Sequence, residues 1–293
     1  MTAKRTPDPQ ASPENRPILA MVYDFDGTLS PGNMQEYAFI KRLRQQPEEF
    51  WKKCKAYAQA HEADKILSYL CTMIDESSKN DEVRITREDF VRDGREIELF
   101  PGVEEWFGRV NAYAADKGFE AEHYIISSGL SEMIEGTSIH QQFKAVYACK
   151  FAYDKHGVAK WPALAVNYTE KTQYLFRINK GALDVKDDRQ INEFISESDR
   201  RVPFRQMIYI GDGATDVPCM KLVKENGGHS IAVYRPEADS IEAQRLIGQR
   251  RVNFIAPADY TAGQKLSDIV TLIVDKLYAE KELGKLAGVP QNR

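Results

Sequence analysis

The chain has 293 residues, of which 42% are hydrophobic and 29% are charged, and its formal net charge is −4. This length is enough for one large domain or two modest ones, and the composition is typical of a globular protein with a sizeable core. An acidic net charge argues against a nucleic-acid partner held by bulk charge, and no apolar stretch approaches the roughly 20 residues that a membrane-spanning helix needs.

The start of the chain and the cysteines bear on location. Residues 1–16 are rich in proline and charge and lack the apolar run of a signal peptide, so we expect a disordered N-terminal tail. The four cysteines are scattered, without the spacing of a zinc site or a disulfide framework, which is typical of a reducing compartment. We therefore predict a cytoplasmic protein with no nucleic-acid and no membrane partner. The patterns assign no oligomeric state.

A short, uninterrupted apolar run, Ile18–Tyr23, leads directly into the sequence Asp24-Phe-Asp-Gly-Thr28. An apolar run that stops at a turn predicts a strand buried on both faces, as in a parallel sheet. Side chains alternate along a strand, so we expect Asp24 and Asp26 on the same side. Two buried carboxylates repel each other unless a cation or a proton compensates, which indicates chemistry at this strand end. An acidic loop is the alternative that this stretch alone leaves open.

The segment after this strand has a helical pattern. It begins behind the turn-rich residues 30–33, and apolar residues then recur three or four positions apart through residues 34–98. This spacing predicts a small all-helical unit of about four helices, whose apolar faces form a core. One helix start is marked by Thr86 and Asp89, which have the spacing of an N-terminal capping arrangement.

From Val103 onward, predicted strands alternate with predicted helices. Such alternation implies an α/β fold with a doubly wound parallel sheet. Because the first strand precedes the helical unit, that unit is an insertion after strand one. The expected elements are a helix at 103–117, a strand at 123–126, a helix from about 131, a hairpin of 146–153 and 158–161, helices at 169–179 and 188–198, strands at 206–210, 230–234 and 252–255, and a helix at 262–278.

Polar side chains gather where the predicted strands end. In open α/β sheets the ligand lies beyond the carboxyl ends of the strands, so these side chains are expected to meet. Clustered carboxylates without histidine or cysteine select a hard divalent cation such as Mg²⁺. Hydroxyls, backbone amides and an ammonium group suit a phosphate. The residues concerned are Asp24 and Asp26 after the first strand, Ser127 and Ser128 after the second, Lys171 at a helix start, and Asp212 and Asp216 after a later strand.

Four short motifs in this order resemble those of the haloacid-dehalogenase-like (HAD) phosphohydrolase superfamily. Residues 24–28 are similar to its first motif, DxDGT, and residues 125–129 to its second, a hydrophobic strand that ends in Ser or Thr. Lys171 is the candidate for the lysine of the third motif, and residues 211–216 are similar to the fourth. The resemblance covers nearly the whole chain after about Pro17.

The resemblance implies a domain layout. Residues 17–32 and 100–281 would form a Rossmann-like HAD core, and residues 33–99 a helical cap of the C1 type. Residues 282–293 would be a C-terminal tail. The cap position is similar to that of the phosphoserine-phosphatase-like branch, although the acid that those enzymes carry after the first motif has no clear counterpart among Asn33 and Glu36.

The resemblance also implies an activity: a Mg²⁺-dependent phosphatase that hydrolyses a small phosphorylated metabolite through an aspartyl-phosphate. Asp24 would be the nucleophile, Asp26 the general acid and then base, and Lys171 the cation that offsets the negative charge of the nucleophile and the phosphate. The metal would be held by Asp24, the backbone carbonyl of Asp26 and Asp212, while Asp216 would hold a metal-bound water or orient Lys171. The phosphate would be bound by Gly27, Thr28, Ser127, Ser128 and Gly129.

Some alternatives stay open at this point. Ser127 and Ser128 both fit the second motif, with Ser127 preferred. Lys180 competes with Lys171, although a lysine near a helix C-terminus more often acts as a capping cation. A phosphomutase, and a non-catalytic HAD-fold protein that binds a phosphate ligand or a partner, are the alternative functions. Asp26 favours phosphate chemistry over dehalogenation.

Overall fold

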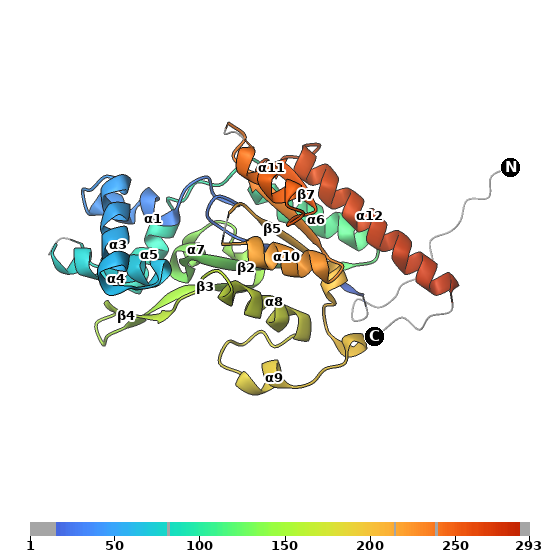
Figure 1. Ribbon diagram of the computed structural model, residues 1–293, viewed down its shortest axis with the longest axis horizontal. Helices are drawn as coiled ribbons and strands as arrows, with labels where there is room; N and C mark the ends of the chain where they lie inside the picture. The colour runs from blue at the N-terminus through green and yellow to red at the C-terminus, as the bar shows by residue number, and fades with distance from the viewer. Residues whose placement is uncertain (1–15, 81–82, 214, 238–239, 288–293) are drawn as a thin grey trace.

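A seven-stranded sheet forms the centre of the computed structural model, which describes residues 16–80, 83–213, 215–237 and 240–287 (Figure 1). The strand order is β4-β3-β2-β1-β5-β6-β7, and every neighbouring pair is parallel except the β3–β4 hairpin. The predicted Rossmann-like α/β fold is therefore confirmed. The strands are β1 (Ile18–Tyr23), β2 (Glu120–Leu130), β3 (Phe143–Tyr153), β4 (Ala159–Leu164), β5 (Met207–Gly211), β6 (His229–Tyr234) and β7 (Phe254–Pro257).

Strand β1 lies at the middle of the sheet and is buried on both faces, as its apolar run predicts. Its last residue, Tyr23, is in register with Ile125 of β2 on one side and with Ile210 of β5 on the other. The backbone N–H of Asp24 then donates to the carbonyl of Ile210 over 2.9 Å. The strand order reverses at β1, so Asp24 leaves the sheet at its topological switch point.

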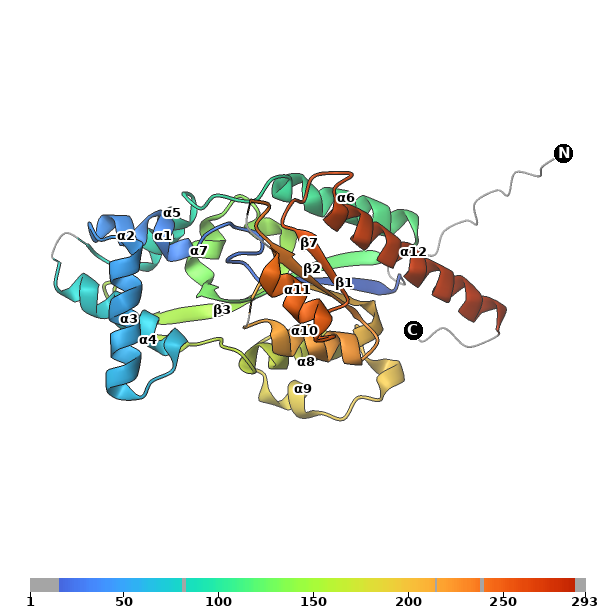
Figure 2. The ribbon, with the colours of Figure 1, turned by 45° about the horizontal axis from the view of Figure 1, so that its top comes forward.

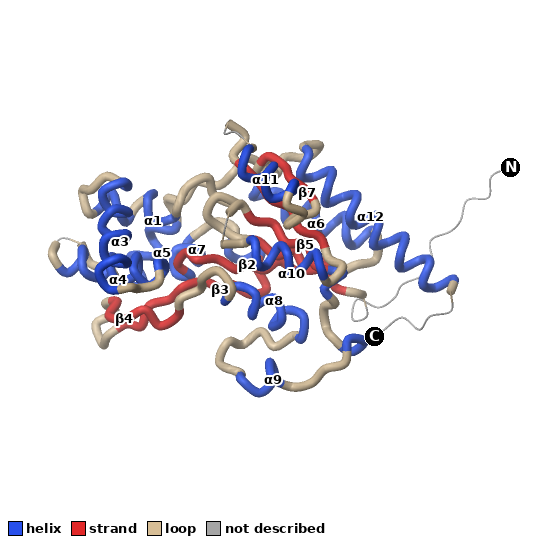
Figure 3. The backbone as a smooth tube through the Cα atoms, in the orientation of Figure 1, coloured by secondary structure: helices blue, strands red, loops and turns tan. Residues whose placement is uncertain are grey.

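Helices cover both faces of the sheet. Figure 2 shows α6 (Val103–Asp116) and α12 (Lys265–Leu286) on one face, and α8 (Glu170–Lys180) and α10 (Val217–Glu225) on the other. The same sandwich is seen in Figure 3, where the strands run between the helices. The shorter helices of this part are α7 (Ser131–Gly136), α9 (Asp188–Asn192) and α11 (Ile241–Gly248), with 3₁₀ turns at His140–Gln142, Glu197–Asp199 and Phe204–Gln206.

The residues between β1 and α6 form a helical segment, residues 34–94, at one end of the molecule (Figure 1). Thr86 accepts a hydrogen bond from the N–H of Asp89 and the two residues form the predicted capping box. Among its described residues the segment has five helices rather than about four, because two of them are single turns. They are α1 (Met34–Tyr37), α2 (Phe39–Arg42), α3 (Pro47–His61), α4 (Lys65–Ser78) and α5 (Arg87–Gly94).

The helical segment contacts the rest of the protein where α5 packs against α7, the helix that follows β2. The two helices meet backbone to backbone: a Cβ added at Gly94 would lie 2.0 Å from the carbonyl oxygen of Met133, and one at Gly136 would lie 1.9 Å from that of Val91. Glycine is therefore required at both positions. An ion pair between Arg87 and Glu135 closes the same contact.

The largest differences from the sequence-based expectations are in three elements. Strand β2 continues through residues 127–129 to Leu130, with a register shift against β3, instead of ending at residue 126. Helix α9 ends at Asn192 instead of residue 198, since the backbone becomes extended at Glu193, and Phe194 beyond it is 93% exposed. Helix α12 extends to Leu286, supported by an ion pair between Lys285 and Glu282, so residues 282–286 are helical and not part of a tail.

Two of the expectations concern residues outside the described ranges. The predicted N-terminal tail lies there apart from Arg16, and so do residues 288–293. Across the described chain, no helix combines the length and the apolar character that crossing a membrane requires.

Candidate active site

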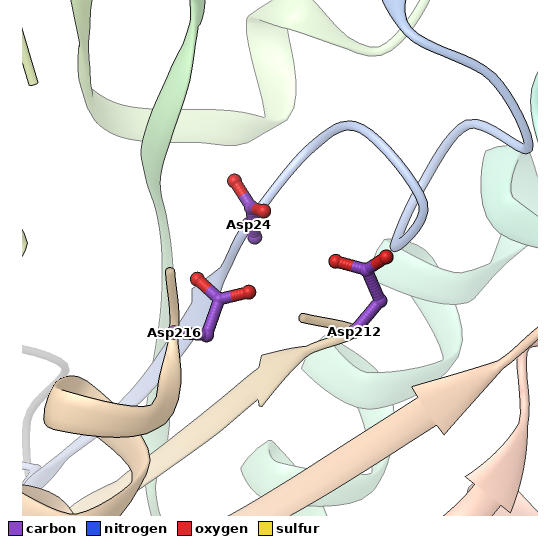
Figure 4. A group of neighbouring side chains, drawn as sticks. All are labelled: Asp24, Asp212 and Asp216. Atoms are coloured by element: carbon purple, nitrogen blue, oxygen red, sulfur yellow. The ribbon is translucent and has the colours of Figure 1, made fainter. Parts of the chain in front are cut away.

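Three carboxylates converge where β1 and β5 end. Asp24 follows β1, Asp212 follows β5 and Asp216 is the N-cap residue of α10, and Figure 4 shows the three side chains pointing toward one another. One oxygen of each lies within 4.8 Å of the others. The sheet topology therefore brings together three of the predicted metal ligands from distant parts of the sequence. The side chain of Asp26 is not part of this group.

A glycine makes this convergence possible. Gly27 has φ +74°, and a Cβ added there would lie 2.1 Å from Oδ2 of Asp212. Its N–H donates to the carbonyl of Ser30 over 2.7 Å, which closes the turn after β1. Any other residue at this position would be strained and would push the Asp212 carboxylate away.

Lys171 lies between two of the carboxylates and is fully buried. Its Nζ is 3.1 Å from Oδ1 of Asp24 and 2.7 Å from Oδ1 of Asp216. Burial alone lowers the pKa of Lys171, but the charges of Asp216 and Asp24 outweigh it and the net shift is upward, so the ammonium stays charged. The hydroxyl of Tyr209 donates a hydrogen bond to the same Asp216 oxygen over 2.7 Å and helps to fix the Asp216 carboxylate.

Lys180, the competing lysine, lies elsewhere. Its Nζ donates to the backbone carbonyls of Ile191 and Glu193, each over 2.7 Å, at the C-terminal end of α9. Of the two lysines, Lys171 is the one beside Asp24.

Asp26 is oriented by the helical segment. Its Oδ1 accepts a hydrogen bond from the backbone N–H of Met34 over 3.0 Å, and a Cβ at Gly129 would lie 3.3 Å from its Oδ2. Burial, and then the charge of Asp24, raise the pKa of Asp26 well above its ordinary value. Burial and the charge of Asp216 likewise raise the pKa of Asp24 to about 7, against the opposing effect of Lys171. Of these two acids, Asp26 lies apart from Lys171 and is the better placed to hold a proton.

The predicted phosphate-binding residues differ in what they face. Ser127 and Ser128 line a cavity that also reaches Asp24. Oγ of Ser127 accepts from the N–H of Gly129 over 3.0 Å, while Oγ of Ser128 is buried without a hydrogen-bond partner in the described structure. Thr28, Gly27 and Gly129 are not among the lining residues of this cavity.

The cavity has a volume of about 760 Å³ and lies between the sheet and the helical segment. One wall carries Asp24, Asp26 and Asp212. The other wall comes from α1, α3 and α4, and includes Gln35, Trp51 and Tyr69. Sequence reasoning did not find these residues or Tyr209, because periodicity marks an apolar face without showing which of its members border a ligand.

The donor set fits a hard divalent cation. Three carboxylates, those of Asp24, Asp212 and Asp216, lie together, and the one ammonium group paired with them among the described residues is that of Lys171. Burial, and then the charges of Asp216 and Asp24, raise the pKa of Asp212 well above its ordinary value. Oxygen ligands with this excess of negative charge are what Mg²⁺ and related ions prefer.

Comparison with known proteins settles the family. A family model described as haloacid dehalogenase-like hydrolase matches residues 21–221. The chain belongs to this family. Among curated proteins, it is 28% identical to an uncharacterized protein of Borreliella burgdorferi over 279 residues, which span 86% of this chain and 95% of that protein.

Solved structures of HAD proteins share the fold. A HAD family hydrolase of Salmonella enterica serovar Typhi aligns with a TM-score of 0.55 at 15% identity, over 90% of this chain and 74% of the other. A phosphoserine phosphatase, solved as an analogue of its phospho-aspartyl intermediate, aligns with a TM-score of 0.52 at 14% identity, over 88% and 99%. The family predicted from the four motifs is thus confirmed.

Proposed function

We propose that this HAD protein is a Mg²⁺-dependent phosphatase that hydrolyses a small phosphomonoester through an aspartyl-phosphate on Asp24. The observation that carries the proposal is the position of the Asp24 carboxylate, 3.1 Å from the buried ammonium of Lys171 and within the group formed with Asp212 and Asp216. A carboxylate held in this way is desolvated, oriented and open to the cavity, which is what a nucleophile needs.

In the first step, an oxygen of Asp24 attacks phosphorus and the bond to the alcohol oxygen breaks. Asp26 supplies the proton that the leaving oxygen takes up. In the second step, the Asp26 carboxylate accepts a proton from water, which attacks the aspartyl-phosphate and releases inorganic phosphate. Asp24 and protonated Asp26 are then restored.

The other residues position the reacting groups and balance their charge. Lys171 keeps its proton throughout and offsets the charge of Asp24, while Tyr209 and Asp216 hold Lys171 in place. Ser127 and Ser128 offer hydroxyl donors to the phosphate oxygens from the cavity wall. A Mg²⁺ ion held by Asp24, Asp212 and the Asp26 carbonyl would neutralise negative charge on the phosphoryl group.

In this proposal, residues 33–99 act as a cap over a core of residues 17–32 and 100–281, and the substrate is a metabolite rather than a phosphoprotein. Two observations support it: the second wall of the cavity comes from the helical segment, and phosphoserine phosphatases are among the proteins with this fold. The cytoplasmic location stays a prediction from the scattered cysteines.

The test is release of phosphate from p-nitrophenyl phosphate and a metabolite panel, with and without Mg²⁺, against an Asp24→Asn control. We expect turnover that needs Mg²⁺ and the Asp24 carboxylate. Turnover no higher than that of the control on every substrate would contradict the proposal. Asp26→Asn is expected to abolish turnover but to keep Mg²⁺ binding, because only the backbone carbonyl is the proposed ligand.

A further inference from the structure

The wall that the helical segment contributes to the cavity has an unusual charge balance. The acids that line the cavity among the described residues are Asp24, Asp26 and Asp212, all on the wall formed by the sheet. The opposite wall contains no carboxylate, but it contains two lysines, Lys55 of α3 and Lys65 of α4. That wall therefore attracts anions and offers no counterion to an ammonium group.

The nearest acid of α1 does not change this balance. Oε1 of Glu36 accepts hydrogen bonds from the side-chain amide of Asn33 and from the indole N–H of Trp51, each over 2.6 Å. Asn33 and Trp51 line the cavity, whereas Glu36 does not. Glu36 therefore supports Asn33 and Trp51 without lining the cavity, and the side chain that residue 33 contributes to the lining is an uncharged amide.

Both lysines are free to meet a ligand. Neither Lys55 nor Lys65 forms an ion pair within the part of the chain that the structure describes, and both are exposed. By contrast, Lys53, two residues from Lys55, is paired with Glu76 at 2.6 Å and Glu49 at 3.2 Å. Lys55 and Lys65 can therefore pair with a ligand, whereas Lys53 already forms ion pairs within the protein.

The size and surface of the wall indicate a ligand with an extended body. A volume of about 760 Å³ lies in the upper part of the range for cavities that enclose drug-sized molecules. Trp51 and Tyr69 border it and meet edge to face with ring centroids 6.2 Å apart, and Ile66 continues the apolar surface. Such a surface binds an apolar or aromatic body.

Gln35 gives the same wall a hydrogen-bonding group. Its side chain lines the cavity and is 2% exposed, and its Oε1 is buried without a partner in the described structure. A buried amide oxygen without a partner is costly, so a ligand donor that reached it would recover this free energy. Gln35 directly follows Met34, whose backbone N–H donates to Asp26, and it lines the same cavity as Asp26.

We infer that the substrate is a phosphomonoester whose alcohol part carries an extended apolar or aromatic body and a second anionic group, and no ammonium group. Trp51, Tyr69 and Ile66 bind the body, and Lys55 and Lys65 bind the second anion, which is a carboxylate or a second phosphate. This inference rests on the proposed phosphatase function and names its substrate class.

The test uses aryl phosphates with matched leaving groups, in which a methylene separates the ring from the substituent. The set consists of 4-(carboxymethyl)phenyl, 4-(phosphonomethyl)phenyl, 4-(carbamoylmethyl)phenyl and 4-(aminomethyl)phenyl phosphate. We expect kcat/KM for at least one anionic ester to exceed that of the neutral carbamoyl ester by about tenfold, and the cationic ester to be the poorest, because two exposed charge pairs contribute about this much. The better anionic ester shows whether a carboxylate or a phosphate is preferred.

Variants assign the preference to the two lysines. Lys55→Met/Lys65→Met is expected to reduce kcat/KM for the preferred anionic ester about tenfold and to leave the neutral ester within about twofold. The matched control is Lys41→Met/Lys52→Met, which removes the same charge from exposed lysines outside the cavity lining and is expected to keep the preference. Equal kcat/KM for charged and neutral esters, or an equal loss on both in the first variant, would overturn the inference.

Binding separates this inference from the proposed function. If no ester is hydrolysed above the Asp24→Asn control, the phosphatase proposal fails. Calorimetric titration of the same esters into the wild-type protein and the two double variants then still decides the substrate class, since the charge preference must appear in Kd. Equal Kd values for anionic and neutral esters would overturn the inference on their own.

Discussion

Replacing Lys171 by methionine is the most direct perturbation of the candidate site, because this fully buried ammonium compensates two carboxylates. At an effective dielectric constant of about 20, its attraction to Asp24 at 3.1 Å is about 5 kcal/mol, and that to Asp216 at 2.7 Å about 6 kcal/mol. The free-energy cost of desolvating Lys171, Asp24 and Asp216 offsets much of this attraction. Removing one partner of a buried pair costs about 3–5 kcal/mol, since a charge is left uncompensated.

Proton uptake limits that loss. Burial and Asp216 already raise the pKa of Asp24 to about 7, so the charge that the substitution uncovers is mainly that of Asp216. Neutralising a carboxyl that has an ordinary unfolded-state pKa costs about 4 kcal/mol at pH 7 and about 1.5 kcal/mol at pH 5. We therefore expect Lys171→Met to lower the free energy of unfolding by about 3–4 kcal/mol at pH 7.

Urea unfolding in EDTA at pH 7 and pH 5 measures this loss. The folded variant binds a proton that the unfolded chain binds less well, so its stability relative to wild type rises as the pH falls, and the loss shrinks by roughly 2 kcal/mol. Lys180→Met is the control on the same helix: it removes hydrogen bonds to two carbonyls, about 1–2 kcal/mol, with no dependence on pH. A loss for Lys171→Met below about 1 kcal/mol, or one that is equal at both pH values, would refute the reasoning.

Three further predictions follow from the geometry. Gly27→Ala, which places a Cβ 2.1 Å from the Asp212 carboxylate at φ +74°, is expected to lower kcat at least about a hundredfold with the fold retained, and circular dichroism with a kinetic assay checks both. Mg²⁺ at about 100 times its Kd is expected to stabilise wild type by about 2.7 kcal/mol in thermal unfolding and Asp212→Asn by much less; equal effects would place the ion elsewhere. Burial lowers the pKa of His123 to about 3, so the unfolded chain gains a proton there below about pH 6.5. Between pH 7.5 and pH 5 the stability of wild type should therefore fall about 2 kcal/mol more than that of His123→Gln, as measured by urea unfolding, and parallel curves would show that this histidine is charged in the fold.

The motifs at the strand ends were predictable because each consists of residues that are neighbours in the sequence. The apolar run before Asp24 predicts β1, and the topological rule for α/β sheets then predicts that Asp212 approaches it. Ser127 and Ser128 could not be separated by sequence, since the strand continues through both and a register shift decides which way each side chain points.

The second wall of the cavity was not predictable for a different reason. Lys53 and Lys55 lie two positions apart in α3 and therefore face different sides of the helix: Lys53 pairs with Glu76, whereas Lys55 borders the cavity. That difference depends on how α3 packs against α4, which local patterns do not specify. The length of α9 was also overestimated: the backbone becomes extended at Glu193, and Phe194 beyond it is exposed.

The backbone contact between α5 and α7 limits how the cavity can open. Helix α7 begins at Ser131, directly after the Ser127–Gly129 stretch, so a swing of α5 would move the residues proposed to hold the phosphate. Gly94 and Gly136 leave no side chains at the contact that could repack during such a swing. If the proposed phosphatase function holds, we therefore expect substrate entry and product release to depend on the α3–α4 pair, so that substitutions at the tips of those two helices change turnover without changing the chemical step.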